Sequence, residues 1–392
     1  SEGITAVDNT RGFDMVVCAD PAAYETICAA FGQTLTADNA ANYVNGLTSS
    51  FTGPTNGQVI LLNASEDSTA AVNALLKAGK SVSVVVDEPY AGSFLCSYAD
   101  WQSVADDYLI SGIGVTDAPT ATAISKAPVI YIAGKPESNS TGFVNTTLVS
   151  GAYEYNYDRQ AMELLGFTVT DDPIQADVII GAAALDDEAL AAVKNGTPYI
   201  GYGYDAMSTA VDLFAEGQLV YETAGDTAMD ALAYVTYPTT SPVTASYVSE
   251  GDNILYGYGA GYFASVPNGA QVLVQLDSSK ELLEGFLPST GEHYADFLNN
   301  SIQAISYAGK GADNADLNVV LFANTLTNKV HQRDEFNFIS NFAFSSVQSE
   351  VEDNTSAFVD VPADAWYANA VAAVTEQGLM GGTSATTFSP LA

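Results

Sequence analysis

Positive charge is the scarcest property of this chain. Its 392 residues include 11 Lys and Arg against 47 Asp and Glu, which gives a formal net charge of −36 at pH 7. A surface of this sign repels nucleic-acid phosphates and anionic lipid headgroups. We therefore expect no nucleic-acid partner. We interpret the acidic excess as a solvated surface in preference to a cation-binding site.

Long apolar runs and basic leader segments are also lacking. No stretch reaches the ~18 apolar residues of a membrane helix, so we expect no membrane insertion. The sequence does not open with the basic and apolar segments of a signal peptide, which an exported protein needs before it is processed. We therefore expect the chain to be part of a longer protein.

Cysteine and histidine are too few for a familiar metal site. Cys18, Cys28 and Cys96 form no metal-binding pattern; the first two could pair, or all three could be buried free thiols. His293 and His331 each precede an Asp by three residues, a spacing that places both groups on one helical face. A zinc site usually needs three protein ligands, and no third histidine exists. We expect no metal and no cofactor.

A helix that ends at glycine and continues into a strand recurs three times. The glycines are Gly79, Gly166 and Gly196, and each is followed within a few residues by an apolar extended run. Short apolar segments that we interpret as buried parallel strands are 59–62, 82–86, 129–132 and 178–180. This alternation predicts an α/β fold with a doubly wound, mostly parallel sheet.

The pattern changes after about residue 235. Strands alternate with Gly- and Pro-rich turns at 234–237, 254–256, 271–276, 302–307 and 319–322. An amphipathic helix follows over 334–344, and Phe338, Ile339 and Phe342 would dock it on the sheet. From these changes we predict four regions: an α/β region at 1–126, an α/β domain at 127–346, a polar linker at 347–357 and a small helical segment at 358–392.

The sequence does not decide whether its clusters of acidic residues bind calcium. Residues 313–318 are similar to a calcium loop, but they lack the EF-hand spacing and its terminal Glu. The acidic groups at 106–107, 171–172 and 186–188 are expected near helix starts, where they complement the helix dipole.

Several segments of the body carry a family resemblance. They are 126–128 leading into a strand, a helix at 159–166, Gly201-Tyr202-Gly203 closing a strand, and 319–322 followed by Arg333 and a helix. Together they resemble a class I glutamine-amidotransferase-like domain, in the version that follows the catalytic domain of some secreted bacterial zinc carboxypeptidases. The resemblance implies a flavodoxin-like sheet.

An active amidotransferase needs a cysteine on a tight strand-to-helix turn, with a histidine as its base. The corresponding turn here, at 201–205, contains no Cys and no Ser. Ser208 falls inside the predicted helix. We therefore interpret Gly201, Tyr202 and Gly203 as a degenerate elbow at the carboxyl edge of a central strand, and we expect no catalytic residue.

The last 35 residues carry a second resemblance. Phe358-Val359-Asp360-Val361-Pro362 precedes a predicted helix with Trp366, Ala370 and Val374 on one face, and Gly378 ends it. This order resembles the S-layer homology domain, whose members tether secreted proteins to bacterial cell-wall polymers. It implies an extracellular location at the cell wall or S-layer, with cell-wall polysaccharide as the partner of complete repeats.

The resemblance assigns weak polymer binding to Asp360 and Trp366. The family's Thr-Arg-Ala-Glu-like signature would follow Ala392, and the given sequence holds one repeat. We therefore expect this segment alone to bind wall polymer poorly.

Three functional hypotheses remain. The first is a non-catalytic accessory or scaffold region of a secreted, wall-anchored protein, the C-terminal part of a zinc carboxypeptidase-like surface protein. The second is a surface peptidase or amidase with an unrecognised site. The third is a carbohydrate-binding module, suggested by Tyr256, Tyr258 and Tyr262 in tyrosine-rich turns.

Overall fold

The computed structural model divides the chain into two units, residues 1–347 and 348–392. It describes residues 4–10, 13–18, 48–134, 157–224, 230–247, 253–258, 261–280, 284–286, 296–297, 299–330, 333–348, 361, 371, 383–384 and 387–389. Within these ranges, no helix combines the length and apolar character needed to cross a membrane. The first unit opens with an antiparallel hairpin of β1 (Ile4–Thr10) and β2 (Phe13–Cys18).

A six-stranded sheet follows the hairpin, in the order β3-β7-β4-β6-β5-β8. Its strands are β3 (Ser50–Thr52), β4 (Gln58–Leu61), β5 (Ser83–Val85), β6 (Phe94–Ser97), β7 (Ser111–Val115) and β8 (Ala121–Ala123). Two helices accompany it, α3 (Glu66–Lys77) and α4 (Tyr98–Val104).

The prediction of parallel strands at 59–62 and 82–86 is wrong. β4 runs antiparallel to β6 and β7, and β5 runs antiparallel to β6 and β8. A short apolar run indicates burial but not direction, and antiparallel strands can be joined by tight turns without a crossover helix.

The predicted helix-ending glycines are confirmed. Gly79, Gly166 and Gly196 have φ values of +72°, +71° and +97°, which lie in the left-handed region that glycine enters without a Cβ clash. They follow α3, α5 (Tyr157–Leu164) and α6 (Asp187–Lys194), respectively.

The body is built on a twelve-stranded sheet whose first five strands are parallel, in the order β10-β9-β11-β12-β20. They are β9 (Val129–Ile132), β10 (Thr168–Thr170), β11 (Val178–Gly181), β12 (Tyr199–Tyr202) and β20 (Asp316–Phe322). This is the flavodoxin-like order, with the topological switch point between β9 and β11. The prediction that residues 199–202 form a central parallel strand is confirmed, since β12 lies between β11 and β20.

The remainder of the sheet is antiparallel, so the expectation of a mostly parallel sheet holds only for those five strands. The path continues β20-β19-β17-β14-β15, and β13, β16 and β18 pair off it. These strands are β13 (Val220–Thr223), β14 (Asp230–Thr236), β15 (Asn253–Tyr258), β16 (Gly261–Ser265), β17 (Gln271–Leu276), β18 (Glu284–Phe286) and β19 (Ile302–Lys310).

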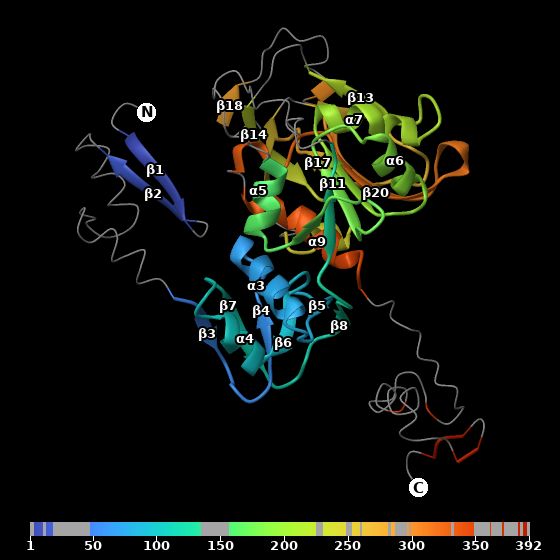
Figure 1. Cartoon of the computed structure of the whole chain (residues 1–392). Helices are drawn as coiled ribbons and strands as arrows, with labels where there is room; N and C mark the ends of the chain where they lie inside the picture. Colours follow the sequence, from blue (N-terminus) through green and yellow to red (C-terminus); the bar gives the residue numbers. More distant parts are fainter. Residues whose placement is uncertain are drawn as a thin grey trace. The chain divides into compact units, whose positions relative to one another are not determined.

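Helices cover both faces of the parallel strands, as a doubly wound sheet requires. Alternate residues of β11 face opposite ways: Val178 and Ile180 join the core that contains α5 and α9 (Phe336–Ser345), and Ile179 joins the core that contains α6 and α7 (Tyr204–Ala210). Figure 1 shows α6 and α7 on one side of these strands. The α/β class is therefore confirmed.

The six-stranded sheet and the body share one core. In Figure 1, α3 lies between them, and it contacts α5 and α9. The Asn73 side-chain amide donates to the Leu165 carbonyl at 2.8 Å, and the Phe94 and Phe344 rings meet edge-on with centroids 5.4 Å apart. These contacts cross from one sheet region to the other within the first unit.

Candidate functional site

The carboxyl edge of the parallel strands is the place where open α/β sheets usually hold their sites. The turn between β12 and α7 lies at this edge. Gly203 occupies the turn with φ +83° and ψ 175°, so the backbone reverses from strand to helix at a residue without a side chain. An added Cβ there would lie 3.4 Å from the Thr325 Cβ, an ordinary contact distance. The turn has space for a Cβ, but φ +83° would strain any residue other than glycine.

The other predicted elbow residues serve the strand. Tyr199 is fully buried beneath Gly201, and a methyl group at 201 would overlap the Tyr199 ring and hydroxyl. Among the described residues, the Tyr199 hydroxyl has no hydrogen-bond partner, and burial raises its pKa. Gly201 is thus required by packing. Ser208 lies on α7, exposed, and donates to the Asp205 carbonyl at 2.6 Å, so it does not face the turn.

A buried carboxylate that the sequence analysis did not identify lies at the same edge. Asp158, in the first turn of α5, has 0% exposure. Its Oδ1 accepts from the Tyr202 hydroxyl at 2.7 Å and the Thr327 hydroxyl at 2.6 Å, and its Oδ2 accepts from the Ala182 N–H at 3.1 Å. Tyr202 ends β12, Ala182 directly follows β11, and Thr327 lies in the segment after β20, so Asp158 joins the segments at the carboxyl ends of three neighbouring parallel strands.

The electrostatics favour a fixed network. Burial, followed by the charge of Asp158 and the hydrogen bond to it, raises the pKa of Tyr202 well above its usual value. Tyr202 therefore stays protonated and keeps donating to Asp158 near neutral pH. A signal for Asp158 did exist in the sequence, since it falls on the buried face of α5 with Ala161 and Met162, where a carboxylate needs partners.

A second buried charge joins the two sheet regions. Arg333 Nη1 lies 2.6 Å from Glu66 Oε1, and the two side chains are 15% and 5% exposed. Glu66 opens α3, and Arg333 opens the 3-10 turn η5 (Arg333–Glu335) before α9. The sequence analysis singled out Arg333 for the family resemblance, and the structure gives it a structural partner.

Several predicted residues lie outside the described part of the chain. They are Cys28, His293, His331, Asp360 and Trp366. In the second unit, Val361 and Val371 are described and buried. Cys96 is a buried free thiol, and burial, followed by the nearby Asp100, raises its pKa to about 12.

The acidic groups have local roles. Asp186 caps α6 by accepting from the Ala189 N–H at 2.9 Å, as predicted for residues 186–188. The expectation for 106–107 and 171–172 is wrong: the first pair follows the end of α4, and the second lies in the turn after β10. Residues 313–315 lie in the turn between β19 and β20, and residues 316–318 begin β20. No group of three metal-ligating side chains gathers in the part of the chain that the structure describes.

Comparison with known proteins identifies the C-terminal segment. Residues 357–392 match the model of the S-layer homology domain. This match indicates association with the cell surface or S-layer. No curated protein matches the chain.

Solved structures show distant similarities. A putative ThuA-like protein from Bacteroides uniformis shares 14% identity over 60% of this chain and 95% of its own, with a TM-score of 0.33. A putative GMP synthase component from Thermoplasma acidophilum shares 10% over 56% of this chain and 94% of its own, with a TM-score of 0.34. PurLQS from Thermotoga maritima shares 14% over 56% of this chain and 97% of that chain, with a TM-score of 0.35. Similarities at this level support no transfer of function.

Proposed function

We propose that this chain is a non-catalytic scaffold or accessory region of a cell-surface protein. The observation that carries the proposal is Gly203: the strand-to-helix turn at the carboxyl edge of the central strand presents no nucleophile. In enzymes that use such a turn, its side chain attacks the substrate while a neighbouring base accepts the proton.

The groups nearest this turn support the same interpretation. The oxygens of Asp158 already accept hydrogen bonds from Tyr202, Thr327 and Ala182, so accepting a substrate proton would require breaking them. Tyr202 is fully buried and its pKa is raised, so it stays protonated near neutral pH and cannot accept a proton there. These groups stabilise the sheet edge instead of opening it to a substrate.

The match at 357–392 supports a surface address, and we propose bacterial cell-wall polysaccharide as the partner of this segment, with Asp360 and Trp366 contributing contacts. The resemblance of the body to the region behind the catalytic domain in secreted zinc carboxypeptidases supports an accessory role beside such a domain. Catalysis, in this proposal, belongs to another domain.

Two measurements test the proposal. The purified chain, shown to be folded by circular dichroism, is incubated with glutamine, peptide and amide substrates; we expect no turnover above buffer. Turnover that is lost in His331→Ala or Asp158→Asn, with the fold retained, would overturn the non-catalytic assignment. In a pull-down with purified cell walls, we expect weak but detectable binding by the unaltered chain; Asp360→Asn and Trp366→Ala should reduce it, whereas Asp313→Asn on the body should not. Equal binding by all variants would refute the surface role of these two residues.

A further inference from the structure

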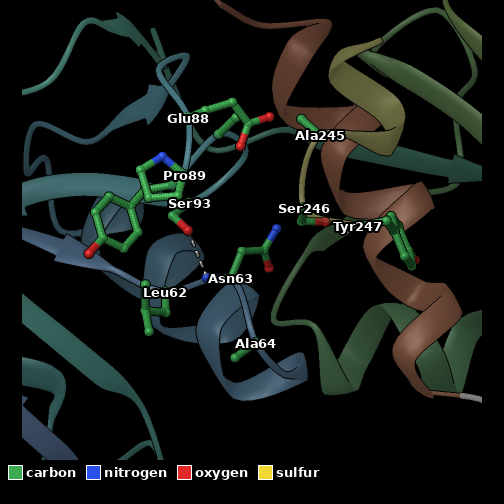
Figure 2. Close-up of a pocket in the computed structure, with 11 residues that line it drawn as sticks. Leu62, Asn63, Ala64, Glu88, Pro89, Ser93, Ala245, Ser246 and Tyr247 are labelled. Atoms are coloured by element: carbon green, nitrogen blue, oxygen red, sulfur yellow. Dashed lines mark hydrogen bonds between the residues drawn. The ribbon is translucent and has the colours of Figure 1, made fainter. Parts of the chain in front are cut away.

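A cavity of about 410 Å³ lies where the six-stranded sheet region meets the body. Its walls come from the segment between β4 and α3 at 62–64, the turn between β5 and β6 at 88–93, and residues 245–247 after the 3-10 turn η2 (Pro242–Thr244). Figure 2 shows these three segments around one space. The volume falls within the range of about 300–1,000 Å³ typical of small-molecule pockets.

Gly92 makes the junction of these walls possible. It has φ +81°, and an added Cβ would lie 2.6 Å from the Ser246 nitrogen and 2.8 Å from the Ala245 carbonyl carbon. Real side chains do not tolerate such distances to backbone atoms. The two regions therefore approach each other here more closely than any other residue would allow.

A hydrogen-bonded amide pair holds the cavity wall in place. Asn63 Nδ2 donates to the Gly92 carbonyl at 3.2 Å and to Asn341 Oδ1 at 3.0 Å. Asn341 Nδ2 in turn donates to the Val243 carbonyl and to Ser246 Oγ, both at 3.0 Å. In Figure 2 the Asn63 amide points toward Ser246. The wall is fixed before any ligand arrives, which lowers the entropic cost of binding.

This wall leaves hydrogen-bonding capacity unused. Asn63 is only 8% exposed, yet its Oδ1 accepts no hydrogen bond from the described residues. Ser93 Oγ accepts from the Asn63 N–H at 3.4 Å and Ser246 Oγ accepts from Asn341; within the described chain neither hydroxyl donates. The Glu88 carboxylate lies exposed at the rim. The Asn63 oxygen is closed off from solvent, so the hydrogen-bonding capacity open to a ligand is that of the two serine hydroxyls and the Glu88 carboxylate.

We propose that this cavity binds a neutral, polyhydroxylated ligand of monosaccharide size. Hydroxyl groups both donate and accept, which suits two serine donors beside the carboxylate of Glu88. Pro89 and Tyr90 supply apolar surface for the C–H face of a sugar ring. The described lining residues include no Lys, Arg or His, so an anionic ligand gains no ion pair there and meets the Glu88 charge.

Binding is tested by isothermal titration calorimetry and ligand-observed NMR with the full chain. The probes are D-glucose, D-galactose, D-mannose and N-acetyl-D-glucosamine, with D-glucuronate as the anionic partner of glucose. We expect at least one neutral sugar to bind with a dissociation constant near ~1 mM. We expect glucuronate to bind at least about tenfold more weakly than glucose, because Glu88 repels its carboxylate.

Variants locate the binding. Ser93→Ala and Ser246→Ala each remove one donor and should weaken binding about five- to tenfold. Ala64 lines the cavity and is exposed, so Ala64→Trp should block the cavity without disturbing the core. The matched control is Ala99→Trp, at an exposed position on α4, and this variant should bind the sugar normally. Thermal melting checks that each variant is folded.

Three results would overturn the assignment. The first is no binding of any neutral probe at 20 mM, about twentyfold above the expected constant. The second is binding that survives in Ala64→Trp, which would place the sugar elsewhere on the chain. The third is glucuronate binding as tightly as glucose, which would show that the Glu88 carboxylate does not face the ligand.

Discussion

Asp158→Asn tests the buried network at the carboxyl edge. The substitution keeps the shape of the side chain but replaces one acceptor oxygen with an NH₂ group. If that group faces Ala182, two N–H donors oppose each other and neither can turn away, because the backbone is fixed. If it faces Tyr202 and Thr327, both hydroxyls must rotate and lose their hydrogen bonds to a charged acceptor.

The expected cost follows from these contacts. A hydrogen bond to a charged group contributes about 1.5–3 kcal/mol, and buried donors left without acceptors cost about 1–3 kcal/mol each. Since the amide keeps one acceptor and the terms are not additive, we expect Asp158→Asn to lower the free energy of unfolding by about 3 kcal/mol. This is a large share of the roughly 5–15 kcal/mol that stabilises a typical domain.

The assay is urea unfolding followed by circular dichroism, at pH 7. Asp205→Asn is the matched control at the same edge of the sheet. Burial raises the pKa of Asp205, so its negative charge does not favour the folded state. Replacing this carboxylate should change the free energy of unfolding by less than about 0.5 kcal/mol. A Thr327→Val variant closes a double-mutant cycle, in which we expect a coupling energy above about 0.5 kcal/mol. A cost below about 1 kcal/mol for Asp158→Asn, or equal costs for both Asp variants, would refute the role of Asp158.

Three further predictions follow from burial and charge. Burial is the main cause of a raised pKa at several tyrosines, including Tyr199, Tyr202, Tyr221, Tyr237 and Tyr247. Their folded-state pKa values lie above the unfolded value of about 10, so their contribution to stability is complete below about pH 10 and is lost as the pH rises beyond it. Tyrosinate absorbance and the circular dichroism signal should therefore change together in an alkaline titration. Full titration of the tyrosines without unfolding would contradict this prediction. With Cys18 and Cys28 changed to Ser, the Cys96 thiol should resist a thiol reagent at pH 8 until denaturant is added, and rapid labelling of the folded chain would disprove its burial. In urea unfolding, Glu66→Gln should destabilise the first unit by about 3–5 kcal/mol, because it leaves Arg333 with a weakened buried partner. The control Glu163→Gln, on α5, should leave the free energy of unfolding nearly unchanged. Equal effects of the two substitutions would argue against the ion pair.

The sequence was most informative where local rules and the fold agree. The glycines at 79, 166 and 196 predicted helix ends because a left-handed residue is needed there, and the structure has positive φ at all three. The central strand at 199–202 could be predicted because a buried apolar run that ends at a glycine turn has few possible positions in a doubly wound sheet.

The parts that were missed depend on contacts between distant segments. Strand direction in the six-stranded sheet is set by turns and neighbours, which short apolar runs do not encode. Asp158 could have been noticed from its place on an apolar helix face, but its donors come from β12 and from the segments that follow β11 and β20. The cavity wall joins Asn63 to Asn341, which are 278 positions apart, and no local pattern indicates that contact.

The two polar regions of the first unit differ in one physical respect. At the sheet edge, the Asp158 carboxylate accepts from three donors, so a ligand would have to displace protein hydrogen bonds that already stabilise the fold. At the cavity, two serine hydroxyls donate no hydrogen bond within the described chain, so a ligand that accepts from them adds hydrogen bonds without breaking any. Binding is favoured where hydrogen bonds are gained. This contrast is the reason to assign a structural role to the edge that resembles an active site, and a binding role to the cavity between the two sheet regions.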